Sequence, residues 1–226
     1  MKRPFAPLWR SLNWPNRISL MRIACVAPFV VLLLNQRQWP HARHVAIGVF
    51  ILMAFSDVLD GYLARKRGQI TRLGTILDPL ADKVLITCSV LLLASGRASV
   101  GGERLANWVV VGVVGKDLWV VVGFLVIFLI TGQLKIQPTR VGKLCTMTQL
   151  AMVTGVLVAP DLNRLGYDVG SWIARGLGWL VMGMTAAAVI SYTRLGVAFL
   201  AEAGETGHDK QPHPAANAAD ETTEEQ

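Results

Sequence analysis

Residues 107–130 read NWVVVGVVGKDLWVVVGFLVIFLI, and this run decides the fold. Its only charged residues are Lys116 and Asp117, near the middle of the run. An apolar run of about 20 residues is long enough for a helix to cross the roughly 30 Å hydrocarbon core of a bilayer. The run therefore predicts a transmembrane helix, and we expect the membrane to organise the rest of the chain.

Five more apolar stretches lie on either side of this run, each about 17 to 24 residues long, which is the length of a membrane-spanning helix. The 226-residue chain is 53% hydrophobic and only 16% charged, whereas roughly a quarter of the residues of a soluble domain are charged. We therefore predict an all-α integral membrane protein. Its six transmembrane helices should cover approximately Ile18 to Leu34, Val45 to Ala64, Leu77 to Ala94, Asn107 to Ile130, Lys143 to Ala159 and Trp172 to Leu195.

The two ends of the chain differ in composition from this six-helix domain, which we place at residues 18–200. Residues 1–17 mix basic with aromatic and aliphatic side chains, which is typical of an amphipathic helix lying on an anionic cytoplasmic leaflet. A basic flanking anchor with no further role would have the same composition. Residues 201–226 contain too few apolar side chains to form a core, so we predict a disordered cytoplasmic tail.

The loops indicate how the chain is oriented. Lys and Arg are more frequent in the N-terminal segment and in the loops after the second and fourth spans than in the other loops. Basic residues mark the cytoplasmic side, so we predict a multi-pass protein of the cell (inner) membrane with both termini in the cytoplasm. The net charge of +7 then needs no nucleic acid as a partner. Cys25, Cys88 and Cys145 lie in or beside apolar segments without paired spacing, so we interpret them as packing residues.

Four aspartates lie in residues 56–85, SDVLDGYLARKRGQITRLGTILDPLADKVL, where the second and third spans meet. Asp57 and Asp60 are three residues apart, and Asp78 and Asp82 are four apart, so each pair shares one face of a helix. The short segment between the two spans makes them antiparallel neighbours. We therefore expect all four carboxylates to converge on the cytoplasmic side.

Converging carboxylates in a poorly solvated place repel one another unless some are protonated or a cation neutralises them. A set of oxygen ligands without Cys or His suits hard ions such as Mg²⁺ or Mn²⁺, and also Ca²⁺. Four carboxylates carry enough charge for two divalent ions, an arrangement that assists displacement at phosphorus. The alternative is structural: aspartates that cap helices and pair with Arg65, Lys66 and Arg72.

The same segment resembles the signature of the CDP-alcohol phosphotransferases without departure. The matching residues are Asp57-x-x-Asp60-Gly61-x-x-Ala64-Arg65 and Gly74-x-x-x-Asp78-x-x-x-Asp82. The resemblance implies an enzyme with six spans that transfers a phosphatidyl or phosphoalcohol group from a CDP-linked donor to an alcohol and releases CMP. It also implies the roles of the residues: metal ligands at Asp57, Asp60, Asp78 and Asp82, a general base at Asp82, and donor contacts at Gly61, Arg65, Thr71 and Gly74.

The start of the first span carries a second resemblance. Residues 15–22, PNRISLMR, are similar to the Pro-Asn-x-x-Thr-x-x-Arg entry of phosphatidylglycerophosphate synthases, with Ser19 in place of Thr. The hydroxyl is retained, so the resemblance implies a CDP-lipid site lined by Asn16, Arg17, Ile18 and Ser19. An ordinary helix start followed by a snorkelling Arg22 would give the same pattern.

Membrane embedding favours a lipid donor, CDP-diacylglycerol, whose acyl chains can stay in the bilayer. Arg140 and Lys143, just before the fifth span, suit an acceptor that carries phosphate, although they also fit a topology signal alone. Basic residues do not separate the possible acceptors, but Gly142-Lys143-x-x-Thr146 resembles the corresponding segment of glycerophosphate-using members. We predict glycerol 3-phosphate as acceptor and phosphatidylglycerophosphate as product. The same loop is also similar to that of CMP-forming cardiolipin synthases, which use phosphatidylglycerol, and another CDP-diacylglycerol-dependent phosphatidyltransferase is a further alternative.

Two other classes fit less well. A cation carrier or channel would carry acids deep in several spans, and an inert scaffold would not need four acids beside Gly61, Arg65 and Gly74. The sequence leaves two points open. Lys116 and Asp117 either neutralise each other or reach a polar cavity. Small residues on the fourth and sixth spans permit a homodimer and equally permit tight packing within one subunit.

Overall fold

The computed structural model describes the backbone of residues 14–67, 72–100, 104–131 and 139–208, and the side chains of residues 19–56, 80–100, 104–130 and 139–201. Within these ranges every regular element is a helix, which confirms the predicted all-α class. The helices are α1 (Trp14–Leu34), α2 (Ala42–Arg67), α3 (Arg72–Ala94), α4 (Asn107–Thr131), α5 (Arg140–Asn163) and α6 (Val169–His208).

Three helices in the described part of the chain are long and apolar enough to cross a bilayer. They are Asn107–Ile130 in α4, Arg140–Asn163 in α5 and Val169–Ala201 in α6. Two shorter apolar stretches, Ser19–Leu34 and Ala42–Ser56, lie in α1 and α2. These helices indicate a membrane protein, because their long apolar faces have no partner inside the molecule and remain exposed.

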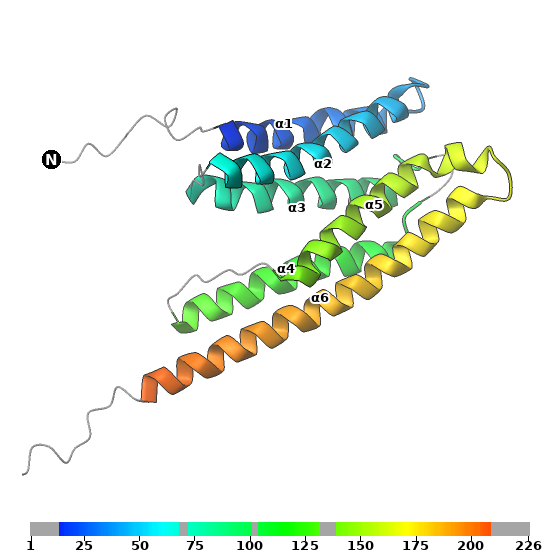
Figure 1. Cartoon of the computed structure of the whole chain (residues 1–226). Helices are drawn as coiled ribbons and strands as arrows, with labels where there is room; N and C mark the ends of the chain where they lie inside the picture. Colours follow the sequence, from blue (N-terminus) through cyan, green and yellow to red (C-terminus); the bar gives the residue numbers. More distant parts are fainter. Residues whose placement is uncertain (1–13, 68–71, 101–103, 132–138, 209–226) are drawn as a thin grey trace, which may run out of the picture.

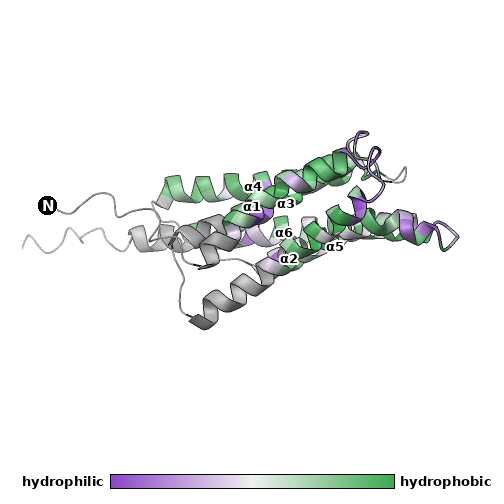
Figure 2. Ribbon diagram, turned by 90° about the horizontal axis from the view of Figure 1, so that it is seen from above, coloured by the Kyte–Doolittle hydropathy of each residue, from purple (hydrophilic) through white to green (hydrophobic). Residues whose placement is uncertain are grey.

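The helices form two groups joined by α5. Helices α1, α2 and α3 pack together, α4 packs beside α6, and α5 crosses between the groups with its largest contact on α6 (Figure 1). Successive helices run in opposite directions, so the connections after α1, α3 and α5 gather at one end (Figure 1). Figure 2 shows hydrophilic residues concentrated at that end, while the helix bodies are mainly hydrophobic.

Aromatic and charged side chains mark this same end of the bundle. Trp39, Trp108 and Trp172 are exposed there, as expected for amphipathic rings at a membrane interface. Arg43 at the start of α2 donates to Asp161 and to the Leu157 carbonyl near the end of α5. This contact ties α5 to the group of α1, α2 and α3 at the end opposite the start of α1.

The core lies where α1, α2, α3 and α5 meet. Phe29 and Phe50 are fully buried with ring centroids 5.5 Å apart, and Leu85 and Leu157 pack into the same cluster. Helices α5 and α6 approach still more closely at Gly170, where an added Cβ would lie 2.1 Å from the Ala159 carbonyl oxygen. The core therefore depends on large side chains at one interface and on a glycine at the other.

The ends of the chain depart from the predicted boundaries in one respect. Helix α6 continues to His208, beyond the predicted domain end at residue 200, because residues 200–205 are mainly Ala and Glu, which favour helix, and contain no proline. The rest of the predicted tail, residues 209–226, and the predicted interfacial segment up to residue 13 lie outside the described residues. Helix α1 begins at Trp14 with Pro15 in its first turn, where proline is tolerated.

Candidate functional site

The central feature of the candidate site is an ion pair between α1 and α3. The Arg22 guanidinium donates to Asp82 Oδ1 at 2.8 Å, and the Arg22 side chain is only 1% exposed whereas that of Asp82 is 28% exposed. A buried arginine is tolerated when a carboxylate and further hydrogen bonds balance its charge. Arg22 therefore holds the Asp82 carboxylate in place and does not snorkel to the membrane surface.

Asp82 also borders a small cavity between three helices. Its other walls come from Met53 and Ala54 on α2 and from Thr146 and Leu150 on α5. Thr146 and Leu150 are four residues apart on α5, and Lys143 lies three residues before Thr146 on the same helix face. At about 10 Å³ the cavity is no larger than one water molecule. A substrate would therefore have to lie nearer the helix ends, on the side where α2 ends and α3 begins.

The backbone places the remaining motif residues at these helix ends. Asp57, Asp60, Gly61 and Arg65 lie in the last turns of α2, and Gly74 and Asp78 in the first turns of α3. Their side chains are outside the described set, and Thr71 lies outside the described backbone. Among the side chains that the structure does describe, no three His, Cys, Asp or Glu residues form a candidate metal site.

The predicted residues of the first helix all lie in its first two turns. Asn16, Arg17 and Ile18 belong to α1, but their side chains are not among those described. Ser19 is fully buried and precedes Arg22 by three residues, so it faces the same side of α1. Arg22 itself was not among the predicted site residues, although its place at the end of the Pro-Asn-x-x-Ser-x-x-Arg pattern was a signal that could have identified it.

The predicted acceptor residues lie in the first turn of α5. Thr139 caps this helix by accepting a hydrogen bond from the Gly142 amide at 3.0 Å, and Arg140 and Lys143 are both exposed. Cations are unfavourable at a helix N-terminus, where the helix dipole and free amides attract anions. Helix stability therefore does not explain two exposed cations at this position.

A second charged cluster lies between α3 and α4. Asp117 accepts a hydrogen bond from Lys83 Nζ on α3, and it forms an ion pair with Lys116 Nζ at 3.2 Å. Lys116 is buried, with 8% of its side chain exposed. Sequence reasoning identified Lys116 and Asp117 but missed Lys83. An acid inside a transmembrane helix needs a cationic partner, and Lys83 was the candidate on the preceding span.

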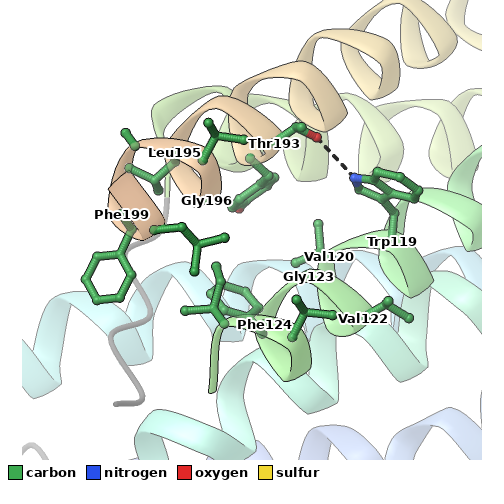
Figure 3. Close-up of a pocket in the computed structure, with 15 residues that line it drawn as sticks. Trp119, Val120, Val122, Gly123, Phe124, Thr193, Leu195, Gly196 and Phe199 are labelled. Atoms are coloured by element: carbon green, nitrogen blue, oxygen red, sulfur yellow. Dashed lines mark hydrogen bonds between the residues drawn. The ribbon is translucent and has the colours of Figure 1, made fainter. Parts of the chain in front are cut away.

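A larger and mainly apolar cavity lies between α4 and α6. It has a volume of about 520 Å³, its walls are mostly apolar, and its lining residues come from α4 and α6 alone (Figure 3). At one side Trp119 Nε1 donates to Thr193 Oγ1 at 3.1 Å, so this polar pair is satisfied internally. Because no residue of α1, α2 or α3 lines this cavity, it does not belong to the aspartate site.

Comparison with known families decides how the Asp82 site is classified. The family model described as CDP-alcohol phosphatidyltransferase matches residues 12–195. The chain belongs to this family. The match begins just before α1 and ends within α6, so it includes Arg22, Asp82 and the whole aspartate motif. The family match thereby confirms, over most of the chain, the resemblance that the motif indicated.

Several relatives share one printed name, CDP-diacylglycerol-glycerol-3-phosphate 3-phosphatidyltransferase. The Bacillus subtilis protein is 29% identical over 71% of this chain and 82% of its own length. The Aquifex aeolicus protein is 32% identical over 68% of this chain and 82% of its own length. The chloroplastic form 1 from rice is 32% identical over 81% of this chain and 56% of its own length. The chain thus spans most of the two bacterial relatives and just over half of the rice protein.

Proposed function

We propose that this member of the CDP-alcohol phosphatidyltransferase family transfers the phosphatidyl group of CDP-diacylglycerol to glycerol 3-phosphate, giving phosphatidylglycerophosphate and CMP. The observation that carries the proposal is the position of Asp82, the last residue of the aspartate motif, held by the buried Arg22 where α1, α2, α3 and α5 meet. The family match and the names of the relatives support the same activity.

The donor set of the aspartate motif fits divalent metal ions. Asp57, Asp60, Asp78 and Asp82 supply only carboxylate oxygens, from the end of α2 and the start of α3, which suits two Mg²⁺ or Mn²⁺ ions. When bound, such ions supply charge that stabilises the diphosphate and the departing CMP. Gly61, Arg65, Thr71 and Gly74 would line the nucleotide part of the donor site, with Asn16, Arg17, Ile18 and Ser19 beside its lipid part.

Asp82 acts as the general base in the proposed reaction. The acceptor hydroxyl oxygen attacks the phosphorus that bears the diacylglycerol oxygen, and its proton passes to the Asp82 carboxylate. A new P–O bond forms to the acceptor, and the P–O bond to the CMP phosphate breaks with its electron pair leaving on CMP. Arg22 orients Asp82 for this proton transfer, which depends on the distance between the carboxylate and the hydroxyl.

Arg140 and Lys143 would bind the phosphate of the acceptor. Both are exposed in the first turn of α5, and Lys143 lies one turn before Thr146, which borders the same small cavity as Asp82. An anion bound there would gain from both cations and from the helix N-terminus. A phosphate held at this point leaves the glycerol hydroxyls of the acceptor free to reach toward Asp82.

The membrane arrangement follows from the same proposal. Six spans within residues 18–200, a cytoplasmic interfacial segment at 1–17 and a C-terminal tail would place the active site at the cytoplasmic face of the inner membrane. The donor could then reach the site from the bilayer and glycerol 3-phosphate from the cytoplasm. Small residues on α4 and α6 would permit a homodimer.

A side-by-side acceptor assay tests the proposed function. Purified protein in mixed micelles receives CDP-diacylglycerol, Mg²⁺ and one radiolabelled acceptor: glycerol 3-phosphate, phosphatidylglycerol, serine or inositol phosphate. We expect labelled phosphatidylglycerophosphate and CMP with glycerol 3-phosphate only. Cardiolipin formed from phosphatidylglycerol would instead establish the alternative acceptor, and no CMP release with any acceptor would contradict the enzymatic proposal.

A further inference from the structure

Two ion pairs hold consecutive residues of α3 on different sides of the helix. Asp82 binds Arg22 on α1, and Lys83 binds Asp117 on α4. Consecutive residues of a helix point about 100° apart around its axis. Helix α3 is therefore held by charge pairs to two different neighbours at a single level along its length.

We propose that Lys83 and Asp117 are positioning residues that fix the rotation of α3, and with it the direction of the Asp78 and Asp82 face. This inference rests on the proposed function, because the rotation of α3 matters only if that face carries the chemistry. Neither Lys83 nor Asp117 needs to touch a substrate for this role.

In a membrane protein, polar contacts between helices help to fix how each helix is rotated. A helix surrounded by lipid gains little from turning its apolar side chains inward, because lipid chains are as apolar as leucine. Interhelical polar contacts and close packing therefore set its rotation. Leu85, Val90 and Leu93 of α3 are buried in the core, whereas Leu80 and Leu91 are about half exposed. Packing therefore gives α3 an inward face, and the two ion pairs restrict its rotation further.

The cluster has a third member, Lys116, so that two lysines surround one carboxylate. Lys116 also contacts the Asp117 carboxylate, at 3.2 Å, but it lies on α4 beside Asp117. A contact between neighbours on one helix cannot tie α3 to α4. Lys83 and Lys116 thus share one carboxylate, and only Lys83 forms a link between helices.

This arrangement supplies a matched pair of variants for the full-length protein. Lys83→Met removes the ion pair between α3 and α4 and leaves Asp117 paired with Lys116. Lys116→Met removes the same charge and leaves the link intact. We expect Lys83→Met to lower kcat at least tenfold, because displacement of a reacting group by about 1 Å can cost about 100-fold. The KM values for CDP-diacylglycerol and glycerol 3-phosphate should stay within threefold of wild type.

Further variants separate positioning from direct contact with a substrate. Asp117→Asn also breaks the link, but it leaves the buried Lys116 without its carboxylate. We therefore combine it with Lys116→Met, and Asp117→Asn/Lys116→Met should lower kcat in the same way as Lys83→Met. Lys83→Arg should restore most of the lost kcat. Lys116→Met should retain kcat within threefold, and melting temperatures in detergent should show that Lys83→Met is folded.

Any of the following results would contradict the inference. Full turnover by Lys83→Met would show that the link is not needed. A raised KM for glycerol 3-phosphate with Lys83→Met, together with normal kcat for Asp117→Asn/Lys116→Met, would mean that Lys83 contacts the acceptor. Equal losses in Lys83→Met and Lys116→Met would assign the effect to charge. If the wild-type protein released no CMP, both the proposed function and this positioning role would be wrong. If the wild type were active and Lys83→Met were equally active, only the positioning role would be wrong.

Discussion

At the scale of single residues, Asp82 is the position on which the proposed chemistry depends. Asp82→Asn keeps the size of the side chain and can still accept a hydrogen bond from Arg22, but it cannot take a proton from the acceptor. We expect CMP release to fall by at least 1,000-fold, consistent with loss of a general base worth about 10²–10⁴, while donor binding is partly retained. Turnover is measured as CMP release, and donor binding by retention of labelled CDP-diacylglycerol.

Asp161 provides the matched control for this substitution. It is also an aspartate paired with a buried arginine, Arg43, but it lies at the opposite end of the bundle. Asp161→Asn should weaken the contact between α2 and α5 without changing the kcat of the folded protein. Comparable loss of turnover in both variants would argue against a base at Asp82 and for general damage to the helix packing.

Arg22 gives a separate prediction about stability. Its side chain is 1% exposed, so replacement by Gln leaves Asp82 without its cationic partner in the core. The Asp82 carboxylate left behind is 28% exposed, so we expect a cost of about 1–3 kcal/mol, seen as a fall in melting temperature in detergent. Arg37→Gln is the control, because Arg37 is exposed and such surface changes usually stay within about 0.5 kcal/mol. Equal melting temperatures for the two variants would be inconsistent with a structural role for Arg22.

The residue scale also shows the limit of sequence reasoning. The motif identified Asp82 as a site residue, because its spacing from Asp78 places both on one helix face. Its partner Arg22 lies 60 positions earlier, and sequence alone left two environments open for that arginine, buried or snorkelling. Sequence alone also did not identify the partner of Lys83, because the residue of α4 that Lys83 meets depends on how the two helices are rotated. Helix periodicity fixes relative directions within one helix, but it does not fix which neighbour each face meets.

At the scale of elements, the helices follow the apolar pattern closely. The predicted span at Asn107 to Ile130 corresponds to α4 at Asn107–Thr131, and the first apolar stretch ends at Leu34 as predicted. Other helices are longer than the predicted spans, as at α2, which begins at Ala42 and continues to Arg67. Hydropathy predicts only the part of a helix that favours lipid, whereas polar residues can extend the helix beyond it.

Close packing of α5 on α6 is testable with a glycine pair. A Cβ at Gly170 would lie 2.1 Å from the backbone oxygen of Ala159, so Gly170→Ala must push the two helices apart. We expect a loss of about 1–3 kcal/mol, typical of overpacking, measured by thermal unfolding in detergent. Gly176→Ala on the same helix is the control, because an added Cβ there meets nothing within 4 Å.

The two glycine variants should therefore differ. Gly176→Ala should leave stability unchanged or slightly raised, since alanine favours helix more than glycine does. If Gly170→Ala were as stable as Gly176→Ala, the contact between α5 and α6 described here would be wrong.

At the scale of the whole molecule, the orientation in the membrane can be measured directly. In a background without Cys25, Cys88 and Cys145, we introduce Arg97→Cys near the start of the α3–α4 connection, or Ala201→Cys near the end of α6. If basic loops set the topology, a membrane-impermeant maleimide added to intact cells should label Arg97→Cys and not Ala201→Cys. The opposite labelling would place the aspartate motif on the outer side and contradict the proposed access of glycerol 3-phosphate.

The central proposal is that acidic side chains from α2 and α3 would meet at one site and together bind two divalent ions. Electron paramagnetic resonance of Mn²⁺ bound to the purified protein with CDP-diacylglycerol tests it most directly. We predict two spin-coupled ions about 4 Å apart, with coupling lost in both Asp57→Asn on α2 and Asp78→Asn on α3. Absence of bound Mn²⁺, or coupling that survives either substitution, would contradict the proposal.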